Sequence, residues 1–486
     1  MAIGSERTTR LVTAAAAVVW MLALSARPAG AEAASLSLVG ADPLAARGLN
    51  AGLAIADHCA YVGSRGQGPV EIVDIARPDH PTTAGQVAAW PGSTERELRA
   101  IPDQRVLVVL TYALTSSGVN RLDFYRWDAD CTEVHRAGSY SFGSRAPHEM
   151  YLWHAGGRSL LFVSMFASGN PALQVVDVTN PANPTLAGGW STPVGELHSI
   201  SLSADGARAY LSLWRGGFLI ADASDFTSFR ANPTLHLLTQ VADAVPAPAG
   251  GNVHSAVPVP GRDLVVLTDE RYPPPACPYG PARLVNVSEP SHPRVISTLR
   301  APQNDAGTCA NAPVDVYTSH NPTLTPDLAL VSWYASGLQV FDISSPAEPA
   351  RLAEYRASAV LPGAIDPQLV GSGAMSWSYP IVRDGLIYLA DINQGLLVLS
   401  YQGPHQDEVG GLAFAEGNSN LLAQQAAPAA TPTGPRPAAG PISPTRKGSR
   451  PAAGPNGGAV AAAVILVLLA GAVFALRRRS YEGPEV

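Results

Sequence analysis

Two observations predict an all-β fold, a seven-bladed β-propeller closed by an N-terminal strand. First, the 486 residues include 45 Gly and 43 Pro, and only 15% are charged, a composition typical of many short strands joined by turns. Second, one strand-and-turn pattern recurs through residues 36–404. A helical solenoid would show a 3.6-residue apolar period, and the chain shows none.

The recurring unit is an alternating apolar strand that ends in a polar residue and a turn closed by proline. Its clearest copies are VEIVDIARPDHP (from Val70), LQVVDVTNPANP (from Leu173), ARLVNVSEPSHP (from Ala282) and LQVFDISSPAEP (from Leu338). Polar side chains cap such turns, and proline ends the strand because it has no N–H to donate.

Weaker copies of the unit bring the number of repeats to seven. Each repeat has one residue that aligns with Asp74, the polar residue at the end of the strand in the first copy. These positions are Asp74, Tyr125, Asp177, Asp222, Asn286, Asp342 and Ser400. A period of about 50 residues with several short strands per unit indicates propeller blades. The seventh unit lacks its fourth strand, and we expect SLSLVG (Ser35–Gly40) to supply it and so to close the ring.

The N-terminus predicts export. Arg7 and Arg10 precede an apolar run, and an Ala-x-Ala cleavage pattern follows near Ala31 or Ala33, so residues 1–33 are expected to be a signal peptide. The alternative, a first transmembrane helix, is disfavoured because the apolar run is short.

The C-terminal part predicts a membrane anchor. Residues 458–476 are uncharged and long enough to cross a bilayer, and Arg477, Arg478 and Arg479 place the tail 477–486 in the cytoplasm. Residues 405–457, rich in Pro and Ala, are predicted to be a disordered stalk. The propeller ectodomain is expected to span residues 34–404.

The strand-and-turn motif resembles the LVIVD repeat of bacterial and archaeal cell-surface propellers. The motif is most specific in LQVVDVTNPANPTLAGGW (from Leu173) and LALVSWYASGLQVFDISSPAEPARLAEY (from Leu328). The resemblance implies a secreted or surface-attached propeller and carries no shared activity. A more distant similarity, through the histidines below, is to selenium-binding protein and methanethiol oxidase propellers, whose axial histidines are associated with metal.

Four histidines open the innermost strands of units three to six. They are His148, His198, His254 and His320. In a closed ring they would lie near the central channel on one face, where they could ligate Cu, Zn or Fe with Glu149 as a carboxylate partner. The alternatives are that each histidine only ties a loop to the next blade, or that the histidines contact a ligand or act as acid and base.

Other candidate ligand contacts lie near the same face. They are Glu149, Trp214, Asp269, Arg271, Asp315, Trp333 and Tyr334. Glu270 is expected to line the rim together with Asp269, Arg271 and Asp315. For the aromatic residues, packing between blades is the alternative. Cys277 and Cys309 are expected to pair in an exported protein and to staple two long loops beside the histidines. Cys59 and Cys131 suggest a second disulfide on the opposite face.

The net charge of the chain and the lack of several catalytic motifs exclude some classes of function. A net charge of -7 without a basic stripe argues against nucleic-acid binding, and no phosphate-binding loop, serine elbow or zincin motif is present. The sequence therefore predicts a membrane-anchored extracytoplasmic module that binds or displays a protein, glycan or small molecule. The alternative is a metal-dependent extracytoplasmic enzyme, oxidase- or hydrolase-like, that uses the four histidines.

Overall fold

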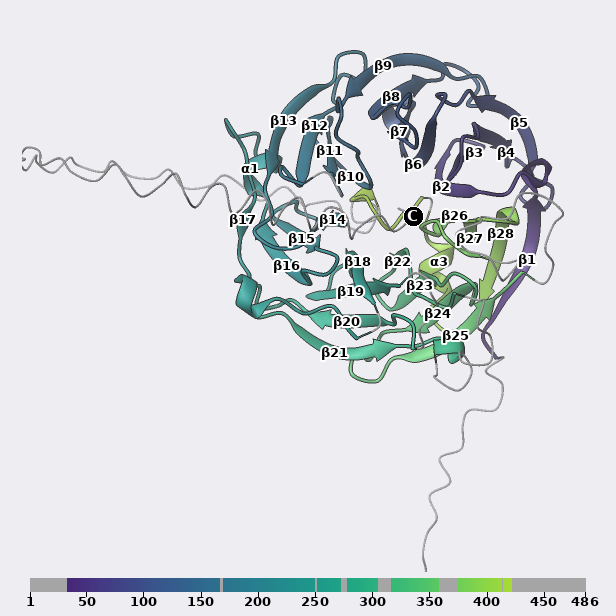
Figure 1. Ribbon diagram of the computed structural model, residues 1–486. Helices are drawn as coiled ribbons and strands as arrows, with labels where there is room; N and C mark the ends of the chain where they lie inside the picture. Colours follow the sequence, from purple (N-terminus) through teal and green to yellow (C-terminus); the bar gives the residue numbers. More distant parts are fainter. Residues whose placement is uncertain are drawn as a thin grey trace, which may run out of the picture.

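The computed structural model describes residues 33–421 except 167–168, 250, 272–277, 305–315, 358–374 and 413. Seven four-stranded antiparallel sheets surround one axis (Figure 1). The prediction of a seven-bladed propeller with four strands per blade is confirmed. The signal peptide, most of the stalk, the 458–476 segment and the tail lie outside the described residues. Within the described residues, no helix is long and apolar enough to cross a membrane.

Each of blades one to six uses four consecutive strands, from the axis outward. Blade one has β2 (Asn50–Ala56), β3 (Cys59–Ser64), β4 (Val70–Asp74) and β5 (Thr82–Val87). Blade two has β6 (Ser93–Ile101), β7 (Val106–Ala113), β8 (Arg121–Arg126) and β9 (His135–Ser141). Blade three has β10 (Met150–Ala155), β11 (Arg158–Ser164), β12 (Leu173–Asp177) and β13 (Thr185–Trp190). Blade four has β14 (Ser199–Leu202), β15 (Arg208–Ser212), β16 (Phe218–Asp222) and β17 (His236–Leu237). Blade five has β18 (Asn252–Pro258), β19 (Leu264–Glu270), β20 (Ala282–Asn286) and β21 (Arg294–Leu299). Blade six has β22 (Pro322–Leu324), β23 (Leu328–Ser332), β24 (Leu338–Asp342) and β25 (Ala350–Tyr355).

Blade seven joins the two ends of the domain. It has β26 (Ile381–Arg383), β27 (Leu386–Asp391), β28 (Gly395–Gln402) and, as its outer strand, β1 (Ser35–Asp42). β1 pairs antiparallel with β28, from Ser35 opposite Gln402 to Asp42 opposite Leu396. The predicted closing strand is therefore confirmed, and the ring has no unpaired blade edge at its seam.

The strands differ in burial according to their distance from the axis. The inner strand β2 is buried along its whole length, whereas the outer strand β5 is mostly exposed. Both faces of an inner or middle strand pack against neighbouring blades, which explains near-continuous apolar runs such as Val106–Leu110. Short helices occupy some of the connections. These are η1 (Leu44–Ala46), η2 (Pro102–Gln104), α1 (Ser224–Thr227), η3 (Val241–Asp243), η4 (Pro302–Asn304) and α3 (Gln406–Gly410).

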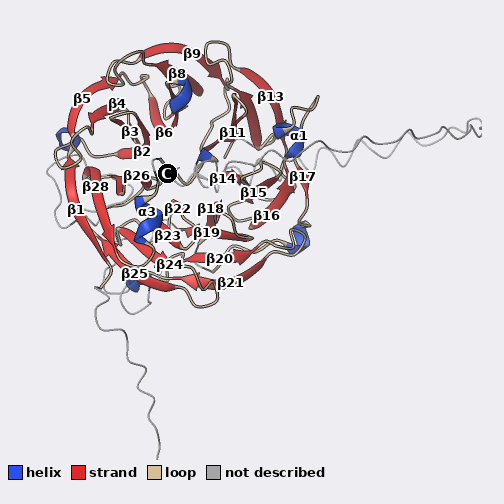
Figure 2. Ribbon diagram, turned by 180° about the vertical axis from the view of Figure 1, so that it is seen from behind, coloured by secondary structure: helices blue, strands red, loops and turns tan. Residues whose placement is uncertain are grey.

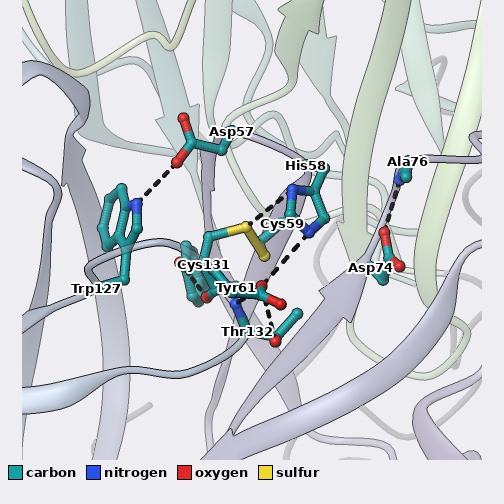
Figure 3. The surroundings of a disulfide bond; sticks show 10 residues. Asp57, His58, Cys59, Tyr61, Asp74, Ala76, Trp127, Cys131 and Thr132 are labelled. Atoms are coloured by element: carbon teal, nitrogen blue, oxygen red, sulfur yellow. Dashed lines mark hydrogen bonds and ion pairs between the residues drawn. A yellow bond between two sulfur atoms is a disulfide. The ribbon is translucent and has the colours of Figure 1, made fainter.

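A disulfide links blades one and two. Cys59, the first residue of β3, bonds to Cys131 in the connection after β8 (Figure 3). The hydroxyl of Tyr61 donates to the Cys131 carbonyl at 2.8 Å, and the indole of Trp127 donates to Asp57 at 2.8 Å. The second disulfide of the sequence analysis is thus confirmed, while Cys277 and Cys309 lie outside the described residues.

The chain does not leave the propeller at residue 404, where the sequence analysis ended the domain. After β28 it forms α3, which lies beside β26 (Figure 2), and residues 414–421 then enter the central channel. We name residues 414–421 the axial plug. It is the yellow-green segment at the centre of Figure 1. This packing was not predicted because the segment is small, polar and outside the blade repeat.

The axial plug is a hairpin inserted from one face. Ala415 pairs antiparallel with Val382 of β26, whereas Ser419 pairs parallel with Leu152 of β10. Because the inner strands of all blades run in one direction along the axis, the plug enters and leaves on the same face. The last part of the plug is bound by Asn420, whose side chain exchanges two hydrogen bonds, of 2.8 and 2.9 Å, with the backbone of His154. His154 lies near the end of β10, so this face is the one opposite His148, which precedes that strand.

Gly417 sits at the turn of the plug because no larger residue fits there. A Cβ atom would lie 2.0 Å from the Pro322 carbonyl oxygen and 2.4 Å from the Tyr379 ring. We therefore expect Gly417→Ala to lower the free energy of unfolding by about 1–3 kcal/mol. Gly410→Ala is the matched control, since nothing lies within 4 Å of its Cβ position. Urea unfolding of the full-length variants measures both changes, and equal stability would contradict the packed plug.

Candidate metal centre

The four candidate histidines occupy one position in four successive blades. The backbone N–H groups of His148, His198 and His320 each donate to the last residue of the second strand of their blade, at 2.9, 2.8 and 2.9 Å. His254 occupies a β-bulge of β18, between Val253 and Ser255. A bulge re-aims the side chain of the extra residue, and here it turns the imidazole toward the axis.

The imidazoles form a continuous arc. Neighbouring ring centroids are 4.5 Å apart for His148 and His198, 4.1 Å for His198 and His254, and 4.1 Å for His254 and His320. The Nε2 atoms of His148 and His198 are 3.0 Å apart. The structure therefore brings all four predicted residues together on the axis.

The other ring nitrogen, Nδ1, is occupied in three of the four. Nδ1 of His198 lies 3.2 Å from the His254 carbonyl oxygen, and Nδ1 of His320 lies 2.7 Å from the Trp377 carbonyl oxygen. A carbonyl only accepts, so in both rings Nδ1 carries the proton. Nδ1 of His254 lies 2.7 Å from the hydroxyl of Ser255, which itself donates to Asn321 at 3.3 Å. We accordingly assign the Nδ1 proton to His254 as well.

This hydrogen bonding directs the Nε2 lone pairs of His254 and His320 to the axis. The Nε2 lone pair of His198 lies there too and accepts from the Nε2–H group of His148 at 3.0 Å, a donor that a bound cation would displace. Metal-bound histidines commonly show the same arrangement, with the second nitrogen donating to a carbonyl or carboxylate that fixes the ring. The same bonds also join adjacent blades, since His198 reaches blade five and His320 reaches blade seven.

Two buried carboxylates complete the cluster. Glu149 Oε1 and Glu270 Oε2 each lie 3.6 Å from His254 Nε2, and Glu270 Oε1 lies 3.5 Å from His320 Nε2. Two sets of three potential ligand atoms lie within 4.8 Å of one another, namely Glu149–His198–His254 and His254–Glu270–His320. The Tyr334 hydroxyl donates to Glu270 at 2.5 Å and so orients that carboxylate.

The side chains enclose a small chamber with polar atoms still unsatisfied. The volume open to the centre of a water-sized sphere is ≈ 10 Å³, about the room for one water molecule or one ion. Its lining includes Glu97 and Trp377. Within the described chain, Glu97 Oε1 and Trp377 Nε1 are buried without a hydrogen-bond partner. Such atoms are rare in folded proteins and indicate a missing ligand or water.

A buried ion-pair network separates the chamber from the axial plug. Arg99 lies between Glu97 at 3.3 Å and Glu416 of the plug at 3.2 Å. Its guanidinium also donates to the Met150 carbonyl at 2.8 Å. All three charged side chains are only about 2% exposed, so each depends on the others for compensation of its charge.

Burial sets the protonation of the cluster. It lowers the pKa of His198 to about 3, and it lowers the pKa values of His148, His254 and His320 well below 6.5. These imidazoles are therefore neutral at pH 7 and able to act as ligands. Burial raises the pKa of Glu149 well above 4.5, and the nearby Glu97 carboxylate raises it further.

Of the other predicted residues, Trp214 and Tyr334 lie beside the histidines. Trp214 stacks on His198 with centroids 4.9 Å apart, and Tyr334 contacts His320 at 5.1 Å. Trp333 points away instead. Its ring is buried against Phe341 and its indole N–H donates to the Tyr317 carbonyl, so it packs between blades.

The predicted polar rim residues do not gather at the cluster. Asp269 forms a buried two-bond ion pair with Arg283, with both distances 2.7 Å. Arg271 follows the end of β19, where its backbone N–H donates to Thr318 at 2.9 Å. Asp315 lies outside the described residues.

Several residues of the centre were absent from the predicted site. Glu270 was predicted only as a rim residue with Asp269 and Arg271, whereas its carboxylate lies beside the axial histidines. Glu97 and Arg99 lie in β6, where a fully buried strand, STERELRAI, contains four charged residues. Four charged residues in one inner strand were the sequence signal that could have indicated a buried polar site there. No signal in the sequence pointed to Glu416, because the axial plug lies after the last blade repeat.

Comparison with known proteins supports the repeat. Residues 166–192, which include β12 and β13 of blade three, match the model of the LVIVD repeat. The chain carries an LVIVD repeat. Among solved structures, the chain is similar to the C-terminal WD40 domain of Sif2, with 10% identity, 76% of this chain and 100% of that chain covered, and a TM-score of 0.47. Comparison with curated proteins found no match.

The lowered pKa of His198 makes a prediction about acid stability. The pKa of His198 is about 3 in the folded chain, compared with an ordinary value of 6.5 for an exposed histidine. On acidification, the unfolded chain therefore binds a proton at this residue before the folded chain does. Stability is therefore lost as the pH falls below 6.5, by about 1.4 kcal/mol per pH unit for this residue. In His198→Phe the unfolding free energy should fall less steeply between pH 6.5 and 4, measured by urea titration with chelator present.

The matched control for this comparison is His135→Phe, which alters an exposed histidine on the outer strand β9. The buried carboxylates titrate in all three proteins, so their effect cancels in the comparison. A His198→Phe curve parallel to that of the parent would contradict burial of a neutral imidazole.

Proposed function

We propose that the axial chamber binds one divalent transition-metal ion, Cu, Zn or Fe. The observation that carries this proposal is the hydrogen bonding of Nδ1 in His198, His254 and His320, which assigns the proton to Nδ1 and directs three Nε2 lone pairs to the axis beside Glu149 and Glu270. The lone pair of His198 accepts from His148 at 3.0 Å, and a cation would take the place of that donor. Imidazole nitrogens suit these three metals, and the carboxylates add charge that favours a cation.

The two ligand sets describe one ion. His254 belongs to both sets, and it has a single free Nε2 lone pair. Each set contains two imidazoles and one carboxylate, a ligand combination of zinc sites that keep the fourth position for water or substrate. When bound, such an ion polarises a coordinated oxygen and lowers the pKa of bound water.

A structural role of the histidines, in which each ties its blade to the next one, is compatible with this proposal. The links between blades use Nδ1 of His198 and His320 and a backbone carbonyl of the next blade. They need no contribution from Nε2. One side chain can therefore hold two blades together and bind a metal at the same time.

The cellular setting that fits is an extracytoplasmic propeller anchored in a membrane. It follows from the expected signal peptide in residues 1–33 and the apolar stretch 458–476. The axial plug leaves the ring on the face opposite His148. A tether starting there would turn the histidine face away from the membrane, toward a protein, glycan or small-molecule ligand. Binding or display at the metal centre is the role we propose.

One observation favours a second candidate, a metal-dependent enzyme of the oxidase or hydrolase kind. Glu149 has a pKa well above 4.5 and lies 3.6 Å from a candidate ligand nitrogen. A carboxyl group of this kind can transfer a proton near neutral pH. Its second oxygen accepts from the hydroxyl of Tyr379 at 3.4 Å.

Metal stoichiometry tests the proposed centre. Full-length chain stripped with chelator and titrated with Zn²⁺ or Cu²⁺ should bind one ion, as measured by elemental analysis after desalting. His254→Ala removes the ligand shared by both sets, so its affinity should fall by about 100-fold or more. His154→Ala is the matched control, because His154 is also buried near the other end of β10 and bonds to Ser159. Equal metal content in the two variants, or much less than one ion in the parent, would refute the centre.

A further inference from the structure

A separate pocket of ≈ 470 Å³ opens on the face opposite the histidines. Its walls come from the far ends of the inner strands of blades four, five and six, at Leu202, Val257 and Leu324, and from the axial plug. The volume falls within the range of small-molecule sites. None of the four histidines lines it.

A buried carboxylate forms one wall of this far-face pocket. Glu416 of the plug lines the pocket and is 3% exposed. Its Oε1 faces Arg99 at 3.2 Å and its carboxylate interacts with the Ser419 side chain, but by strict geometry neither oxygen accepts a hydrogen bond from the described residues. A carboxylate can accept from several donors, so Glu416 keeps unused acceptor capacity where the pocket begins.

The remainder of the inner wall is apolar or aromatic. It is lined by Tyr151, Leu202, Tyr210, Val257, Val259 and Leu324. All six side chains are at least nine-tenths buried. The Tyr151 hydroxyl is directed to the Leu202 carbonyl at 3.4 Å. The pocket thus combines an apolar body with one acidic end, a combination that selects ligands by shape and by charge.

The rim adds two carboxylates and two guanidinium groups. Asp205 and Asp263 line it together with Arg208 and Arg262. Arg262 is engaged outside the pocket, at 3.1 Å from Asp327 and within 3.2 Å of three carbonyl oxygens. With Glu416 included, three carboxylates face two guanidinium groups. Arg99, at 3.2 Å from Glu416, offsets the remaining charge, so the pocket favours a cation through its three carboxylate acceptors and not through an excess of negative charge.

We propose that the far-face pocket binds a small organic amine, independently of the metal centre. The ammonium group would pair with Glu416, and the apolar part would lie against Tyr151 and Val259. Because Arg99 contacts both Glu416 and the chamber residue Glu97, an amine would share the plug carboxylate with that arginine and would not replace it.

Benzylamine is the probe that tests this proposal, with benzyl alcohol as its neutral counterpart. We expect titration calorimetry on the full-length chain, with chelator present, to show one benzylamine site and much weaker binding of the alcohol. Glu416→Gln should weaken benzylamine binding at least about tenfold, since a charge-assisted contact contributes about 1.4 kcal/mol or more.

Two variants separate recognition from stability. Glu97→Gln also removes a partner of Arg99 but does not line the pocket, so it should retain benzylamine binding. Ala204→Trp adds bulk at an exposed position of the lining and should block binding without changing any charge. The proposal is overturned if the alcohol binds as well as the amine, if Glu97→Gln and Glu416→Gln lose binding equally, or if benzylamine does not bind.

Discussion

The backbone pairing of β1 with β28 is the constraint on which the arrangement depends. It joins residues from the two ends of the domain, Ser35 with Gln402, and converts a row of blades into a ring. Only in a closed ring do the first residues of all inner strands meet on one axis. The blade repeat then places His148, His198, His254 and His320 within 4.5 Å of a neighbouring ring centroid, although they are spread over 173 sequence positions from 148 to 320.

Convergence on the axis also concentrates buried charge, and the structure balances it in two ways. The histidines stay neutral because burial disfavours their charged form. The carboxylates Glu97 and Glu416 are compensated by Arg99, which is itself fully enclosed. A buried pair of this kind contributes more to a unique arrangement than to net stability. Here it fixes the axial plug beneath the chamber, so the metal centre and the far-face pocket share one arginine.

The sequence predicted the fold well because a propeller repeats its signals. Asp74, Asp177 and Asp342 are the last residues of equivalent strands, so each copy supports the others, and the closing strand was deduced from the one missing position. The histidines were found for the same reason. Residues that occur once were not predicted at the axis. Glu270 and Glu416 reach the axis through a strand end and a plug that no repeat announces, and Trp333 faces the blade core because strand alternation, not proximity in sequence, decides its direction.

The central claim is that one metal ion lies at the axis, and anomalous diffraction tests it most directly. Crystals of the full-length chain loaded with Zn²⁺, with data collected on both sides of the zinc absorption edge, locate the ion without any assumption about activity. The account predicts a single strong peak about 2.0–2.1 Å from Nε2 of His198, His254 and His320, with a carboxylate oxygen of Glu149 or Glu270 nearby. A chamber without a peak in crystals that bind zinc elsewhere would contradict the account.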